Sequence, residues 1–162
     1  MPAIPNDLFR YLAELGITTA THHHPPLRTV EESKQLRGAL AGGHAKNLYL
    51  RDHRKRNWLV VLDEDREVDL KALAGGIGSG RLSFGSPERL MQYLGVVPGA
   101  VTPFAVVNDR DGEVTVALDK ALLAHTPLNF HPLDNSMTTQ ISPAELVAFL
   151  EATGHRPLLL DL

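Results

Sequence analysis

The sequence of 162 residues contains no cysteine. Disulfides, thiolate nucleophiles, cysteine-based zinc sites and iron–sulfur clusters are therefore excluded. Long hydrophobic runs are also missing: the longest, such as Trp58–Leu62, are far too short to cross a bilayer. The first residues have neither the basic nor the apolar region of a signal peptide. These absences predict a single cytoplasmic domain spanning residues 1–162.

The chain also lacks a strong charge of one sign. Its 16 Lys and Arg residues stand against 19 Asp and Glu residues, for a net charge of −3. Proteins that bind long duplexes non-specifically are usually basic, so this class is disfavoured. One dense basic cluster is formed by Arg51, His53, Arg54, Lys55 and Arg56. It is either a solvated turn between two strands or a patch for a short nucleic acid.

Familiar catalytic and nucleotide-binding motifs are absent. There is no Walker motif, no Gly-x-Ser-x-Gly elbow and no His-Glu-x-x-His helix. The run Gly76–Arg81 lacks the third glycine of the dinucleotide fingerprint and follows a helix-like segment, which predicts a helix end and a loop. His22-His23-His24 offers two ligands on one strand face but no evident third, which favours polar surface over a metal site.

The pattern of apolar residues and turn signals alternates between helix and strand. Helices are predicted at residues 7–15 after an Asn6 cap, at 30–40, at 69–73, after Ser86-Pro87 and after Ser142. Strands are predicted at residues 18–22, 47–51, 58–62, 104–108, 114–118, 128–131, 137–141 and 157–160. The Asp111-Gly112 pair predicts a hairpin that joins residues 104–108 to 114–118. These elements predict a mixed α/β (α+β) domain with a largely antiparallel sheet and surrounding helices.

Three local features carry possible chemistry. Lys46 begins an apolar strand and is either a solvated lysine or a fixed positive charge for a carbonyl, ester or phosphate oxygen. The loop Gly99–Pro103 is either a simple turn or a source of backbone N–H groups for an oxyanion. His131 is either a structural histidine or a neutral imidazole that orients a hydroxyl or a water molecule.

Several segments in a fixed order resemble one family. They are Lys46–Asp52, Arg81–Phe84, Leu94–Phe104 and Asn129–Leu133, within a likeness that runs from His24-Pro25 to Gly154-His155. The sequence resembles the YbaK/prolyl-tRNA synthetase insertion-domain superfamily, and within it the ProX-type deacylases of mischarged Ala-tRNA(Pro). The resemblance implies a YbaK-like fold with a curved sheet, and a hydrolase that cleaves the aminoacyl ester in the service of translation fidelity.

The resemblance also implies roles for individual residues. The implied catalytic residues are Lys46, Gly99, Ala100, Val101 and His131. The implied substrate-binding residues are Asn47, Thr102 and Pro103. The residues implied to bind tRNA phosphates are Arg51, Arg54, Lys55 and Arg56. Lys46 would hold the aminoacyl carbonyl or the ribose, the loop amides would stabilise the oxyanion, and His131 would position the terminal nucleotide or the water.

Neither a metal nor another cofactor is implied. The implied partners are the acceptor end of tRNA(Pro) and prolyl-tRNA synthetase, and a monomer is expected because no coiled-coil seam is present. Two alternatives stay open: a deacylase for another mischarged tRNA such as Cys-tRNA(Pro), and a non-catalytic tRNA-binding module.

Overall fold

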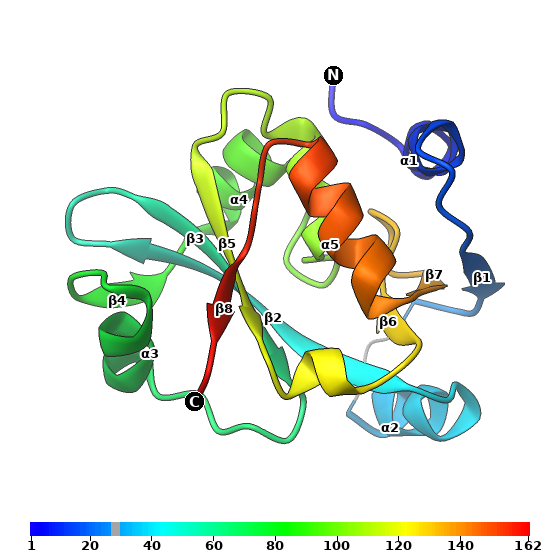
Figure 1. Cartoon of the computed structure of the whole chain (residues 1–162), viewed down its shortest axis with the longest axis horizontal. Helices are drawn as coiled ribbons and strands as arrows, with labels where there is room; N and C mark the ends of the chain where they lie inside the picture. The colour runs from blue at the N-terminus through cyan, green and yellow to red at the C-terminus, as the bar shows by residue number, and fades with distance from the viewer. Residues whose placement is uncertain (27–29) are drawn as a thin grey trace.

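The computed structural model describes residues 1–26 and 30–162, and its elements follow one another as Figure 1 shows. The helices are α1 (Pro5–Glu14), α2 (Val30–Ala39), α3 (Leu70–Ile77), α4 (Pro87–Leu94) and α5 (Pro143–Ala152), with 3₁₀ helices η1 (Pro103–Asn108) and η2 (Leu122–Ala124). The strands are β1 (Ala20–His23), β2 (Gly43–Asp52), β3 (Asn57–Asp63), β4 (Leu82–Phe84), β5 (Val114–Asp119), β6 (Leu128–Phe130), β7 (Met137–Ile141) and β8 (Leu158–Leu160).

The strands form one mixed sheet. Its order is β1-β7-β6-β2-β3-β5-β8, and β4 adds to β2. Four pairings are antiparallel, including the predicted β2–β3 hairpin around the basic turn. The pairs β2–β6, β3–β5 and β5–β8 are parallel. The predicted mixed α/β class is confirmed.

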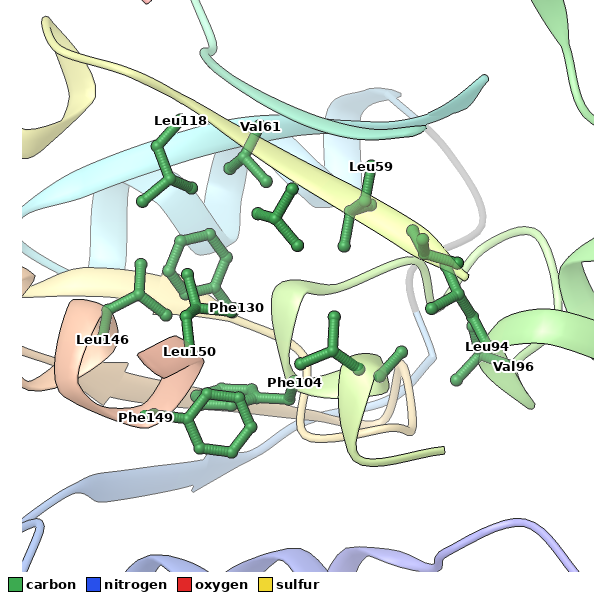
Figure 2. Close-up of a cluster of buried hydrophobic side chains, with 14 of the residues drawn as sticks. Leu59, Val61, Leu94, Val96, Phe104, Leu118, Phe130, Leu146, Phe149 and Leu150 are labelled. Atoms are coloured by element: carbon green, nitrogen blue, oxygen red, sulfur yellow. The ribbon is translucent and has the colours of Figure 1, made fainter. Parts of the chain in front are cut away.

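Helices cover both faces of the sheet, so its central strands are buried on two sides. On β3, Leu59 and Val61 join a core that α1, α4, α5 and η1 complete, as Figure 2 shows in part. Trp58, Val60 and Leu62 face the opposite way and join a second core against α3. This explains why β3 reads as an unbroken apolar run rather than as an alternating one.

The segment predicted as a strand at residues 104–108 is the 3₁₀ helix η1, so the predicted hairpin is wrong. Thr102 caps it, because its Oγ1 accepts a hydrogen bond from the Phe104 N–H at 3.3 Å. Asp109 then accepts from the N–H groups of Glu113 and Val114, which closes a wider connection to β5. A proline in the first turn suits this helix because proline has no N–H to leave unpaired.

Most predicted helix ends are confirmed. Ser86 caps α4 at its start and Gly95, with φ of 66°, at its end. The glycine run ends a helix, but later than predicted, since α3 continues through Gly75 and Gly76 to Ile77 and stops at Gly78 with φ of 71°. The Asn6 cap is wrong, because α1 begins at Pro5, in the position that proline prefers. Within the described residues, none of the helices has the length and apolar character needed to span a membrane.

Candidate active site

The site lies where one edge of β2 is left open. β3 pairs with β2 along one side, at residues 45–51. On the other side, β6 pairs only at Gly43–His44 and β4 only at Leu50–Asp52, so residues 45–48 have no strand partner there in the described part of the chain. A pocket of about 470 Å³ adjoins this edge. It is lined by Asn47, Leu48, Tyr49, Phe84, Gly85, Pro87, Leu90, Pro98, Gly99, Val101 and His131.

His131 follows β6 directly and enters the pocket as a neutral acceptor. Its Nδ1 lies 2.7 Å from the carbonyl oxygen of Met137, so Nδ1 donates the hydrogen and Nε2 is left as the acceptor. Burial lowers the pKa of His131 below its ordinary value, and the hydrogen bond to Met137 offsets only part of that effect. The imidazole is therefore uncharged at neutral pH and has a fixed tautomer.

Hydrogen bonds also close the loop that follows His131. The Oδ1 atom of Asp134 accepts from the N–H of Ser136 at 2.8 Å and from its hydroxyl at 2.7 Å. These hydrogen bonds lower the pKa of the Asp134 carboxyl group. The ring of His24 lies 6.1 Å from that of His131, and the Nε2 of His24 is 2.8 Å from the hydroxyl of Thr138. His131 thus sits between a closed loop and a second histidine.

Of the three loop amides predicted to face the substrate, those of Gly99 and Val101 have no hydrogen-bond partner in the described part of the chain, whereas that of Ala100 has one. The N–H of Ala100 donates to the carbonyl oxygen of Val97 at 3.0 Å, and its side chain is buried. Ala100 therefore closes the turn, which corrects the prediction that its amide faces a substrate. Gly99 and Val101 both line the pocket, and their N–H groups have no partner among the residues that the structure describes.

Thr102 and Pro103 begin the 3₁₀ helix η1 and do not line the pocket. Both are buried, Thr102 caps η1, and Pro103 starts that helix. Neither is among the residues that line the pocket. Thr102 and Pro103, which were predicted to contact the substrate, instead fix the end of the loop that carries Gly99 and Val101.

Lys46 is not among the lining residues either. Side chains alternate along β2, so Lys46 shares a face with Leu48 and Leu50, while Asn47 and Tyr49 face the other way. The ammonium group of Lys46 donates to the main-chain oxygen of Arg66. In this arrangement one of the three N–H groups of the Lys46 ammonium is directed to Arg66.

The floor of the pocket rests on Tyr49 and Gly85, which sequence reasoning missed. The hydroxyl of Tyr49 donates to Oδ1 of Asn57 at 2.7 Å, and the N–H of Gly85 donates to the Tyr49 carbonyl at 3.0 Å. A Cβ atom on Gly85 would lie 2.1 Å from Cε2 of Tyr49, so only glycine fits. The one sequence signal was a glycine placed between a strand and the Ser86 cap.

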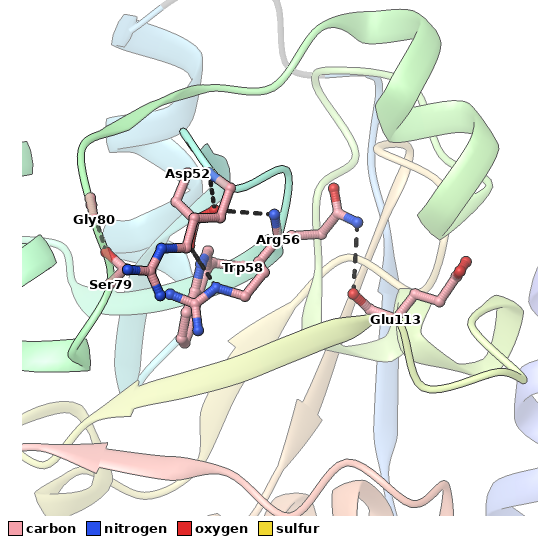
Figure 3. Close-up of polar contacts among 8 residues, drawn as sticks. Asp52, Arg56, Trp58, Ser79, Gly80 and Glu113 are labelled. Carbon is pink, nitrogen blue, oxygen red and sulfur yellow. Dashed lines mark hydrogen bonds and ion pairs between the residues drawn. The ribbon is translucent and has the colours of Figure 1, made fainter.

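Within the predicted basic cluster, some side chains have partners in the fold and others do not. Asp52 accepts from the side chain of Arg56 at 2.8 Å and from Trp58 at 3.3 Å, as Figure 3 shows. Arg51 donates to Asn57 at 3.1 Å and lies over the ring of Tyr93. Arg54 and Lys55 are exposed at the tip of the turn. Among the Lys and Arg residues of this cluster, Arg54 and Lys55 are therefore the two whose side chains have no partner within the described residues.

The described residues offer no metal centre. They contain no group of three or more His, Cys, Asp or Glu side chains placed to hold an ion. Of the three consecutive histidines, His22 contacts Gln140 at 3.1 Å, whereas His24 turns toward Thr138. The two thus have separate polar partners on β7.

Comparisons with known proteins agree on one family. The model of the aminoacyl-tRNA editing domain matches residues 24–149. The prolyl-tRNA editing protein ProX of Acetoanaerobium sticklandii is 41% identical over 145 residues, which cover 89% of this chain and 88% of that protein. The mouse prolyl-tRNA synthetase associated domain-containing protein 1 is 38% identical over 96% of this chain and 94% of its own length.

A solved structure supports the same fold. A candidate trans-editing enzyme for prolyl tRNA synthetase superposes with a TM-score of 0.73 over 100% of this chain and 99% of that one. The two sequences are 22% identical, so the superposition bears on the fold alone.

Proposed function

Because the chain belongs to the aminoacyl-tRNA editing domain family, we propose that it hydrolyses the ester bond of alanyl-tRNA(Pro). The broader activity, aminoacyl-tRNA deacylation within the prolyl-tRNA editing group, follows from its relatives. The choice of alanine is the proposal. A synthetase pocket that admits proline rejects a smaller side chain poorly, which makes alanine the error most in need of a second sieve.

The observation that carries the proposal is the convergence of Gly99, Val101 and His131 on one pocket. Ester hydrolysis passes through a tetrahedral intermediate whose oxygen gains negative charge. The N–H groups of Gly99 and Val101, which no described residue pairs, are fixed donors suited to that oxygen. The free Nε2 of His131 is an acceptor for the attacking water or for a ribose hydroxyl that positions it.

The reaction balances with water as the only co-reactant. The water oxygen bonds to the carbonyl carbon, and the bond from that carbon to the ribose oxygen breaks. A proton from the water ends on the ribose oxygen, which gives free alanine and an intact tRNA. His131 orders the water or hydroxyl, and the loop amides stabilise the charge that develops.

Apolar side chains suit a small amino acid. Tyr49, Leu90 and Val101 line the pocket together with Pro98. A methyl group buries apolar area against such a wall without leaving a polar atom unpaired. We place the alanine side chain here.

Lys46 enters the proposal as a contact outside the pocket lining. It shares its strand face with Leu48, which does line the pocket, and its flexible four-carbon stem allows the ammonium to exchange Arg66 for a ribose or phosphate oxygen. Arg54 and Lys55 would contact phosphates of the acceptor stem. Prolyl-tRNA synthetase, named in the mouse relative, is the partner we propose for delivery.

The test is hydrolysis of Ala-, Pro- and Cys-tRNA(Pro) by the purified protein and by Lys46→Ala and His131→Ala. We expect selective cleavage of the alanyl ester, with losses of about a hundredfold or more in His131→Ala. Cleavage of the cysteinyl ester instead would keep the chemistry and replace the substrate. If none of the three esters is cleaved, the catalytic proposal fails and a tRNA-binding module is favoured.

A further inference from the structure

Asn47 has a buried polar atom that the fold leaves unsatisfied. It lines the pocket, yet its side-chain oxygen Oδ1 is buried and has no hydrogen-bond partner among residues 1–26 and 30–162. A buried carbonyl without a partner costs about 1–3 kcal/mol, so such atoms are rare in folded proteins. An orphan acceptor beside a pocket indicates a group that a ligand supplies.

The main chain of Asn47 adds acceptor capacity at the same place. Even-numbered residues of β2 bond toward β3, as the pairs Asp52–Arg56 and His44–Glu64 show. Odd-numbered residues bond the other way, as the hydrogen bond between Tyr49 and Gly85 shows. Asn47 therefore directs its own N–H and C=O to the open edge, where no described strand pairs with it.

From these acceptors we infer that Asn47 binds the α-ammonium group of the amino acid esterified to the tRNA. The side-chain and main-chain oxygens of one residue face a cation that carries three hydrogens and needs several acceptors. The inference rests on the proposed function, since it assigns the amino-group subsite of the same pocket. It makes Asn47 a specificity-determining residue that separates α-aminoacyl esters from esters without a charged amino group.

The chemistry of the lining favours an ammonium group over an anion. The described residues around the pocket include neither lysine nor arginine, and its histidine is neutral. They include no carboxylate either, so an ammonium group there is bound by neutral acceptors, among which is the unpaired side-chain oxygen of Asn47. The α-amino group, with an ordinary pKa of about 7.7–8.0, is mostly charged at pH 7.

The test compares two esters of one tRNA(Pro): the alanyl ester and the lactyl ester that deamination makes from it. These differ only in an ammonium group exchanged for a hydroxyl. Single-turnover rates at pH 7 are measured for the wild type, Asn47→Leu and Asn47→Asp. Intrinsic reactivity of the esters cancels when the alanyl-to-lactyl rate ratio of each variant is divided by that of the wild type.

Asn47→Leu is expected to lower this ratio by about tenfold to a hundredfold, as removal of a hydrogen bond to a charged group predicts. Asn47→Asp keeps the acceptors and adds a negative charge, so its ratio should equal or exceed that of the wild type. The exposed Asn6 of α1 provides a matched control, and Asn6→Leu should leave the ratio unchanged. Melting temperatures confirm that the variants are folded.

Two results would overturn the inference. An unchanged ratio in Asn47→Leu, with alanyl cleavage still measurable, would show that the ammonium group does not contact Asn47. A ratio that falls equally in Asn47→Asp and Asn47→Leu would show that the acceptor oxygens kept by aspartate do not hold the ammonium group. A wild type that cleaves neither the alanyl nor the cysteinyl ester is a separate outcome, because it overturns the proposed function itself.

Discussion

His131 shows how a single residue acquires its chemistry from its surroundings. Burial favours the uncharged ring, and the carbonyl of Met137 fixes the hydrogen on Nδ1. Protonation must then occur on Nε2, the atom assigned to the water or ribose hydroxyl. The pKa of His131 is lowered, so protonation requires a pH below the ordinary value of about 6.5.

The first prediction is an acid limb in the pH profile of kcat. Activity should be full at pH 7 and fall as the pH drops, with a midpoint below about 6.5. The acid limb should disappear in His131→Gln, with a loss of about a hundredfold at pH 7. Rates measured between pH 5 and 8 check this. A limb that persists in His131→Gln would show that it does not arise from the ring of His131.

Site residues were predictable where residue type alone limits the role. The glycine of the Gly99–Pro103 loop and the histidine His131 stand out in the sequence, and the structure places Gly99, Val101 and His131 on one pocket. The use of the Ala100 amide was not predictable, because it depends on a turn hydrogen bond to Val97. The partner of Lys46 was equally hidden, since Arg66 lies twenty residues away along the chain.

At the scale of elements, local signals determined helix ends and remote contacts determined strand pairing. The two ends of α4, at Ser86 and Gly95, were predictable because capping involves only residues within one helical turn. The parallel pairs β3–β5 and β5–β8 join segments far apart in sequence, which no local pattern encodes. Residues 104–108 were misread because a short apolar run does not by itself distinguish a strand from a helical turn.

The second prediction concerns the junction of β4 and α4. Gly85→Ala places a methyl group against the ring of Tyr49, which is buried and tied to Asn57. We expect a loss of about 1–3 kcal/mol in the free energy of unfolding and a lower kcat/KM for the alanyl ester. Denaturant unfolding and single-turnover rates measure both effects.

Gly75→Ala is the matched control. Gly75 lies within α3, where an added Cβ meets nothing within 4 Å, so alanine should stabilise the helix by about 0.5–1 kcal/mol without affecting catalysis. If Gly85→Ala is as stable and as active as the wild type, the ring of Tyr49 is free to move and is not the floor of the pocket.

At the scale of the whole molecule, the net charge and the local distribution of charge have opposite effects on tRNA binding. A net charge of −3 repels a polyanion, so attraction must come from a local patch. The turn between β2 and β3 carries the exposed Arg54 and Lys55 at one side of the molecule, whereas α1 lies at the opposite side (Figure 1). The attraction of tRNA should therefore depend on the cations of this turn and not on a cation of α1.

The third prediction follows from this asymmetry. The double substitution of Arg54 and Lys55 by alanine should raise KM for aminoacyl-tRNA at low salt and leave kcat unchanged, because phosphate contacts position the substrate without touching the ester. The slope of log KM against log salt should fall by about one for each phosphate that the variant no longer neutralises. Arg10→Ala, which removes an exposed cation from α1, should change neither quantity.

Equal effects of the two variants would mean that net charge, rather than the turn, attracts the tRNA. A fall in kcat with an unchanged KM would place Arg54 or Lys55 in the chemical step, and either result would remove the turn from the binding surface.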